Sequence, residues 1–231
     1  MIRFLRSFDP HRLRLLVFDL DGTLIDSRLD LVHSVNATLR HLGRPELADD
    51  VIASYVGDGA PTLIRRVLGE ADMANEALLR EALEYFLGYY RVHKLDHTTV
   101  YEGIPEILAS LANSSNGLRR QMAVLSNKPV HPSRDIVRAL GLGDFFVSVY
   151  GGNSFSTKKP DPLGAQTILQ ETGIAPEEAL MIGDSSIDIL TGRNAGMWTC
   201  GVTYGFAPHS LEEVLPDVLV ETAREWGELL G

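Results

Sequence analysis

An apolar stretch that ends in two closely spaced acids constrains the fold of this chain more than any other feature. Residues 13–18 are apolar except for Arg14 and are typical of a buried strand in a parallel sheet. Asp19 and Asp21 follow directly, and Gly22 then breaks the strand. Because ligand sites of open α/β sheets lie outside the carboxyl ends of the strands, this strand end is a candidate site.

Two carboxylates at one strand end repel each other unless a cation or a shared proton lies between them. Thr23 and the backbone N–H groups of residues 20–23 offer donors for an oxyanion, as a nest of amides does. The stretch therefore predicts a site for a metal ion together with a phosphate. A plain turn is the alternative, since Asp-Gly is a common turn pair.

Composition excludes several classes of function. The 231 residues are 45% hydrophobic and 23% charged, as expected for a globular protein with one large domain, alone or with a smaller one. The net charge of −10 argues against nucleic-acid binding and requires any anion site to be locally basic or metal-assisted. Cys200 is the single cysteine, so no internal disulfide is possible, which fits a cytoplasmic location.

No apolar run reaches the ~18 residues that a membrane span needs, so no membrane association is expected. Residues 1–14 contain four arginines and lack the apolar centre of a signal peptide. We expect a short extension before the first strand. The sequence leaves open whether the chain is a monomer or a homodimer.

The pattern after the first strand changes twice. Residues 29–94 have helical spacing without a convincing strand, and strands alternate with helices after Val100. This predicts an α/β core, residues 1–28 and 95–231, built as a doubly wound, Rossmann-like parallel sheet with a small all-helical insert, 29–94, after the first strand. Later strands are expected at 122–125, 146–150, 179–182, 198–203 and 217–220, helices at 73–94, 105–112, 133–140, 162–172, 186–194, 210–215 and 222–230, and a loop at 113–117.

Polar side chains also follow three later strands. Ser126 and Asn127 end one, Lys159 with Pro160 follows another, and Asp184 and Asp188 follow a third. Each has a plain alternative: Ser126 as a helix cap, the lysine as a solvated loop residue, and the two acids as first-turn residues favoured by the helix dipole. Because all these strand ends meet at one edge of a doubly wound sheet, their agreement favours one shared site.

The order of these groups resembles the four motifs of the haloacid dehalogenase-like superfamily: Asp-x-Asp-Gly-Thr, then Ser, then Lys-Pro, then Gly-Asp-x-x-x-Asp. The resemblance covers nearly the whole chain and makes the helical insert a cap. It implies that Asp19 is the nucleophile and that Asp21 is the general acid and base. The second acid favours phosphatases over dehalogenases. The lysine before Pro160 is Lys159, with Lys158 as the other choice.

The resemblance also implies a Mg²⁺ cofactor, held by Asp19, Asp184 and the backbone oxygen of Asp21, with Asp188 acting through water or a neighbouring group. Ser126 and Lys159 would be catalytic by holding the equatorial phosphate oxygens. The expected substrate and phosphate ligands are Gly22, Thr23, Ser126, Asn127, Lys159 and Arg66.

Residues 55–60 and 63–68 of the insert resemble phosphoglycolate phosphatases, as do residues 86–90 and 101–105. This implies hydrolysis of 2-phosphoglycolate, with Arg66, or else Arg65, binding the substrate carboxylate; a solvated helix face is the alternative for both arginines. Another small phosphorylated metabolite, such as a sugar phosphate, nucleotide or pyrophosphate, remains an alternative substrate. A phosphate-transferring mutase is less expected, and a non-catalytic binding protein of the same fold is the alternative from another class.

Overall fold

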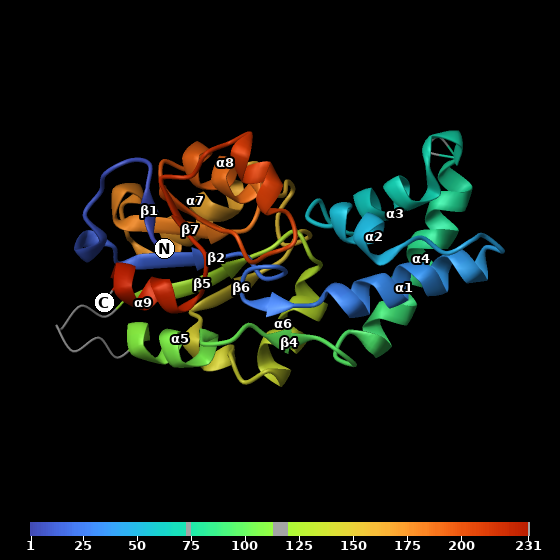
Figure 1. The fold of residues 1–231 in the computed structure, drawn as a ribbon, viewed down its shortest axis with the longest axis horizontal. Helices are drawn as coiled ribbons and strands as arrows, with labels where there is room; N and C mark the ends of the chain where they lie inside the picture. The colour runs from blue at the N-terminus through green and yellow to red at the C-terminus, as the bar shows by residue number, and fades with distance from the viewer. Residues whose placement is uncertain (73–74, 113–119, 231) are drawn as a thin grey trace.

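The computed structural model describes residues 1–72, 75–112 and 120–230 and contains a seven-stranded sheet (Figure 1). The strand order is β1-β9-β8-β7-β2-β5-β6, and β1 alone runs antiparallel to its neighbour. The predicted doubly wound α/β fold is confirmed. The strands are β1 (Arg3–Phe4), β2 (Leu15–Phe18), β5 (Gln121–Leu125), β6 (Ser148–Tyr150), β7 (Ala179–Gly183), β8 (Trp198–Val202) and β9 (Val218–Val220).

The central strand β2 lies between β5 and β7 and is buried on both faces, as its apolar sequence predicts. Its side chains alternate between two hydrophobic clusters. Leu16 and Phe18 pack with α5 (Ile104–Ala112), α6 (Val130–Ala139) and α9 (Arg224–Leu230). Leu15 and Val17 pack with α7 (Leu163–Thr172) on the opposite face. The α8 helix (Ser186–Asn194) contacts β7 and β8 on the α7 side of the sheet, as Figure 1 shows.

The helices between β3 and β4 form a separate cluster, to the right of the sheet in Figure 1. We call these helices the helical cap; they are α1 (Arg28–His41), α2 (Asp49–Ser54), α3 (Ala60–Leu68) and α4 (Glu76–His93). Their apolar faces enclose a core of their own, which includes Val35, Ile64, Phe86 and Tyr90. None of the described helices combines the length and hydropathy that crossing a membrane requires.

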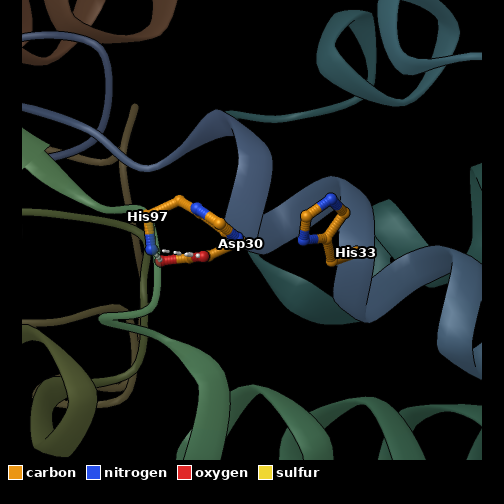
Figure 2. A group of neighbouring side chains, drawn as sticks. All are labelled: Asp30, His33 and His97. Carbon is orange, nitrogen blue, oxygen red and sulfur yellow. Dashed lines mark hydrogen bonds between the residues drawn. The ribbon is translucent and has the colours of Figure 1, made fainter.

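Two chain segments connect the cap with the sheet, and they pair as the short strands β3 (Ile25–Asp26) and β4 (Thr99–Val100). Asp30, in the first turn of α1, strengthens this connection (Figure 2). Its carboxylate accepts hydrogen bonds from the backbone N–H of His97 at 3.0 Å and of Thr98 at 2.8 Å, and from the Thr98 hydroxyl at 2.6 Å. The His33 ring lies edge-on to the His97 ring beside this carboxylate. Asp30 therefore holds the two connecting segments together.

Most predicted elements lie within a few residues of the observed ones, and the differences are short. The expected N-terminal extension contains β1, which pairs with β9, and the pair β3 and β4 was not predicted. The short helix expected at residues 210–215 is a 3-10 helix that begins two residues earlier, at Pro208–Glu212. The predicted loop at 113–117 and the predicted start of the long cap helix at Met73 lie outside the described residues.

Candidate active site

The register of the sheet brings three strand ends together. Phe18 is paired with Val124 of β5 and with Ile182 of β7, so the residues that follow each strand meet at one edge. Asp19 continues the ladder, because its N–H donates to the carbonyl of Ile182 at 2.9 Å. The N–H of Ser126 likewise donates to the carbonyl of Tyr150 at 3.0 Å.

The turn after β2 approaches Asp184 closely, which explains its glycine. Gly22 has φ +80°, and a Cβ there would lie 2.2 Å from Oδ2 of Asp184. Two of the four N–H groups of the predicted anion nest bind protein carbonyls: the N–H of Gly22 donates to the carbonyl of Ile25, and that of Thr23 to the carbonyl of Leu20. The Thr23 side chain is fully buried. The structure therefore places Gly22 and Thr23 inside the turn, beside the predicted site.

Lys159 joins two of the predicted acids. Its Nζ lies 2.7 Å from Oδ1 of Asp19 and 2.6 Å from Oδ1 of Asp188, and the lysine is only 4% exposed. Burial alone would lower the pKa of Lys159, but Asp188 and Asp19 raise it further than burial lowers it. The neighbouring Lys158 instead donates to the carbonyl of Asp58 in the cap. Lys159 is thus the lysine that contacts the expected nucleophile.

Asp188 has both carboxylate oxygens engaged. Oδ1 contacts Lys159, and Oδ2 accepts from the N–H of Ser185 at 3.2 Å and from its hydroxyl at 2.7 Å. The Ser185 and Asp188 contacts form a capping box at the start of α8. Asp188 therefore orients Lys159 and the strand end that carries Asp184.

Asp184 is held by a segment that the sequence reasoning missed. Its Oδ2 accepts from the N–H groups of Phe206 at 2.5 Å and Ala207 at 3.2 Å. Gly205 permits this approach, since a Cβ there would lie 2.2 Å from Cβ of Asp184. The sequence indication of this contact was Gly205 itself, a glycine between two aromatic residues shortly after β8.

Lys128 is a second buried cation that the sequence reasoning did not select. Its Nζ lies 2.7 and 2.8 Å from the two carboxylate oxygens of Asp21. The same atom lies 4.7 Å from the ring centroid of Tyr90 in α4, which places a cap residue against a core residue. Lys128 follows Ser126 and Asn127 directly, so the strand-end argument that selected those two applies to it as well.

The core and the cap together line a cavity of about 60 Å³. Because one water-sized group needs roughly 10–15 Å³ on this scale, the cavity suits a small molecule. The cap loop at residues 56–59 lies against the core, where Nδ2 of Asn127 donates to the carbonyl of Gly57 at 3.1 Å. The polar and charged side chains of the lining include Asp19, Asp21, Tyr90, Ser126, Asn127, Lys128 and Asp184.

Arg66 lies on α3 of the cap and is not one of the residues that line this cavity. Its guanidinium contacts Oδ2 of Asp58 at 2.5 Å and donates to the carbonyl of Tyr55 at 3.0 Å. Arg65 pairs with Glu76 at 2.9 Å. In this structure the two arginines therefore bind groups of the cap itself.

The acids of the site are arranged for a cation. Carboxylate oxygens of Asp19, Asp184 and Asp188 all lie within 4.8 Å of one another. Burial raises the pKa of Asp19 to about 6, with Lys159 opposing the rise. Burial, with Asp188 and Asp19 nearby, raises the pKa of Asp184 to about 8. A bound cation would favour the ionised carboxylates that burial and mutual repulsion disfavour. Because the donors are all oxygens, the set fits a hard cation such as Mg²⁺.

Comparison with known proteins agrees with this geometry. Residues 16–202 match the family model described as haloacid dehalogenase-like hydrolase. A phosphoglycolate phosphatase of Vibrio vulnificus (strain YJ016) is 38% identical over 222 residues, which cover 92% of this chain and 94% of that protein. A phosphoglycolate phosphatase of Pseudomonas putida is 38% identical over 197 residues, covering 84% of this chain and 70% of that protein.

Solved structures show the same fold. The crystal structure of a predicted phosphoglycolate phosphatase from Haemophilus somnus 129pt superposes with a TM-score of 0.88 at 26% identity, covering 95% of this chain and 99% of that one. The chain therefore belongs to the haloacid dehalogenase-like hydrolase family and, within it, is similar to phosphoglycolate phosphatases.

Proposed function

We propose that this hydrolase is a Mg²⁺-dependent phosphatase that converts 2-phosphoglycolate to glycolate and phosphate through an aspartyl phosphate on Asp19. The observation that carries the proposal is the contact of Lys159 with Asp19, which lines a small cavity together with Asp21. The family and the relatives named phosphoglycolate phosphatase support a phosphoric monoester hydrolase.

In the first step, a carboxylate oxygen of Asp19 attacks the phosphorus and the bond from phosphorus to the ester oxygen breaks. Asp21 donates a proton to the leaving oxygen, which releases glycolate. In the second step, Asp21 removes a proton from water, and the resulting hydroxide attacks the phosphorus. The bond to Asp19 then breaks, which releases phosphate and restores the free carboxylate.

The surrounding residues hold charge in place. Lys159 stabilises the transferring phosphoryl oxygens, as a preorganised cation does, and Ser126 lies at the next strand end to donate its hydroxyl. Asp19 and Asp184, with the backbone oxygen of Asp21, would hold Mg²⁺, and Asp188 would act through Lys159. When bound, the cation offsets the repulsion between the anionic nucleophile and the anionic phosphate.

The size of the cavity supports a small substrate, and a soluble phosphorylated metabolite in the cytoplasm is the proposed partner. The side-chain amide N–H groups of Asn127 are directed away from the expected phosphate position. Nδ2 donates instead to the carbonyls of Gly57 and Lys159, at 3.1 Å each. Its proposed role is therefore to join the cap loop to the segment that carries Lys159.

Phosphate release from a panel of small phosphate esters, with Mg²⁺ and with EDTA, tests the proposal. We expect metal-dependent release with 2-phosphoglycolate preferred, and loss of at least about 10³-fold in Asp19→Asn, because a carboxamide cannot form the acyl phosphate. Asp144→Asn, an exposed acid on a 3-10 helix away from the site, is the matched control. Equal turnover of all esters would reject the substrate, and full activity of Asp19→Asn would reject the mechanism.

A further inference from the structure

Lys128 and Tyr90 meet in the wall of the active-site cavity although they belong to different parts of the molecule. Lys128 follows β5 of the core, and Tyr90 lies in α4 of the cap. Both line the cavity, and they are only 7% and 3% exposed. The ammonium nitrogen lies 4.7 Å from the ring centroid of the tyrosine.

This pair has a hydrogen-bond donor without an acceptor in the described part of the chain. An ammonium group has three donors, and Lys128 directs its Nζ at the two carboxylate oxygens of Asp21 while it lies beside Tyr90. The buried hydroxyl of Tyr90 has no acceptor for its proton among the described residues. Since buried polar groups normally find partners, an unpartnered hydroxyl beside a buried cation points to an absent acceptor.

The charge of the cavity wall indicates what kind of acceptor fits. Among the lining side chains in the described part of the chain, Lys128 carries the one positive charge, while Asp19, Asp21 and Asp184 are acids. Lys159 is paired with Asp19 and Asp188 and is not one of the lining residues. An anionic group separate from the phosphate would therefore find its cation at Lys128.

The chemistry of the proposed reaction places such a group at this position. Asp21 has to approach the ester oxygen to protonate it, and in 2-phosphoglycolate the carboxylate is attached to the carbon next to that oxygen. The substrate carboxylate must then lie beside Asp21, which is an anion once it has given up its proton. Two like charges that close are unfavourable unless a cation lies between them, and Lys128 already contacts both oxygens of Asp21.

We propose that Lys128 and the hydroxyl of Tyr90 bind the substrate carboxylate and select phosphate esters that carry an anionic group next to the ester oxygen. This inference rests on the proposed phosphatase function and assigns its specificity. Arg66, which the sequence suggested for this role, binds Asp58 and the carbonyl of Tyr55 instead. Because Tyr90 comes from the cap and Lys128 from the core, the same carboxylate would also hold the two parts together.

The test compares 2-phosphoglycolate with ethyl phosphate, in which a methyl group replaces the carboxylate. The quantity measured is the ratio of their kcat/KM values, so that any effect on the chemistry common to both esters cancels. We expect the ratio to fall about tenfold in Tyr90→Phe, which removes one hydrogen bond to a charged group. We expect a fall of about a hundredfold in Lys128→Met, which removes the charge as well. Tyr89→Phe, the same change on the preceding residue of α4, is the control and should keep the wild-type ratio.

A binding measurement provides a readout that does not depend on turnover. In 3-phosphonopropionate a methylene replaces the ester oxygen, and propylphosphonate is its counterpart without the carboxylate. Calorimetry should show the wild type and Tyr89→Phe preferring 3-phosphonopropionate, and Tyr90→Phe and Lys128→Met losing that preference. Lys128→Arg should retain part of it, because the guanidinium keeps the charge.

The outcomes separate this inference from the proposed function. If the wild type prefers 2-phosphoglycolate and both variants lose activity equally on the two esters, the function stands and the inference is overturned. If the wild type does not prefer 2-phosphoglycolate to ethyl phosphate, nor 3-phosphonopropionate to propylphosphonate, the proposed substrate is wrong and the inference is wrong with it. Selective loss of the carboxylate compounds in both Tyr90→Phe and Lys128→Met supports the assignment.

Discussion

The side-chain amide of Asn127 donates a hydrogen bond to the backbone carbonyl of Gly57 at 3.1 Å, and so joins the sheet edge to the cap loop. Lys158 donates to the next carbonyl of the same loop, that of Asp58. Gly59 then packs against the backbone of Asn127 at the start of α3. The loop at residues 56–59 therefore contacts the core through three consecutive residues. With these contacts formed, the cap loop closes over the active site.

Gly59→Ala should weaken this closure. A Cβ at residue 59 would lie 2.9 Å from the carbonyl oxygen of Asn127, whereas a Cβ at Gly57 meets nothing within 4 Å. Both glycines have positive φ, +83° and +126°, so both alanine variants carry backbone strain and Gly57→Ala controls for it. We expect KM to rise about tenfold in Gly59→Ala, and clearly less in Gly57→Ala. Steady-state kinetics with 2-phosphoglycolate measures both, and equal KM values in the two variants would contradict the role of the Asn127 contact.

Lys159→Met should damage both activity and stability, while Lys158→Met should not. Removing Lys159 leaves Asp19 and Asp188 buried without the cation that both contact, and breaking a buried ion pair costs about 3–5 kcal/mol of unfolding free energy. We expect kcat to fall by about 10²- to 10³-fold, as when a preorganised charge is removed from a transition state. Urea unfolding and phosphate release measure the two effects. The adjacent Lys158→Met loses one contact to the cap loop, so it should retain most of kcat; the opposite order would assign the catalytic role to Lys158.

The sheet was predictable because its strands are buried on both faces, which leaves continuous apolar runs such as residues 15–18. The short strand β1 was not, because Arg3–Phe4 is exposed and its pairing with β9 depends on residues far away in the sequence. The strands β3 and β4 have two residues each, too few for a period of two to show.

The acids of the candidate site were predictable for a local reason: Asp19, Asp21 and Asp184 each follow a recognisable strand. The groups that hold and complement them depend on tertiary structure. The N–H of Phe206 reaches Asp184 only after β8 has paired with β7, and Tyr90 reaches Lys128 only after the cap has folded. Helical spacing marks Tyr90 as a cap core residue and contains no information about the cation next to it.

Gly205→Ala should remove the metal response while leaving the rest of the fold in place. The added Cβ would lie 2.2 Å from Cβ of Asp184, so the carboxylate or the segment that donates to it must move. We expect the variant to lose most of the thermal stabilisation by Mg²⁺ and most of its activity, because misplaced ligands weaken metal binding. Gly227→Ala, where a Cβ meets nothing within 4 Å, is the control. Calorimetry with and without Mg²⁺ measures the response, and a wild-type Mg²⁺ shift in Gly205→Ala would show that Asp184 tolerates the displacement.

The stability of the metal-free protein should fall as pH rises from about 5 to about 8, and the stabilisation by Mg²⁺ should grow over the same range. Burial raises the pKa of Asp184 from 3.8 to about 8 and that of Asp19 from 3.8 to about 6, so the folded state binds more protons than the unfolded state in this window. Stability from a raised carboxyl pKa is present below the unfolded value and is lost as pH rises through the folded value.

The cation requires the ionised carboxylates, so protons and Mg²⁺ compete for the site and the metal stabilises more at high pH. Each kcal/mol changes Tm by about 2–4 °C in a chain of this size, so calorimetry from pH 5 to 8.5, with Mg²⁺ and with EDTA, resolves the effect. Asp184→Asn is the matched control: its metal-free Tm should depend less on pH, and its Mg²⁺ shift should be small at every pH. A Mg²⁺ shift in the wild type that is equal at pH 6 and pH 8.5 would mean that the buried carboxylates are already ionised before the cation binds.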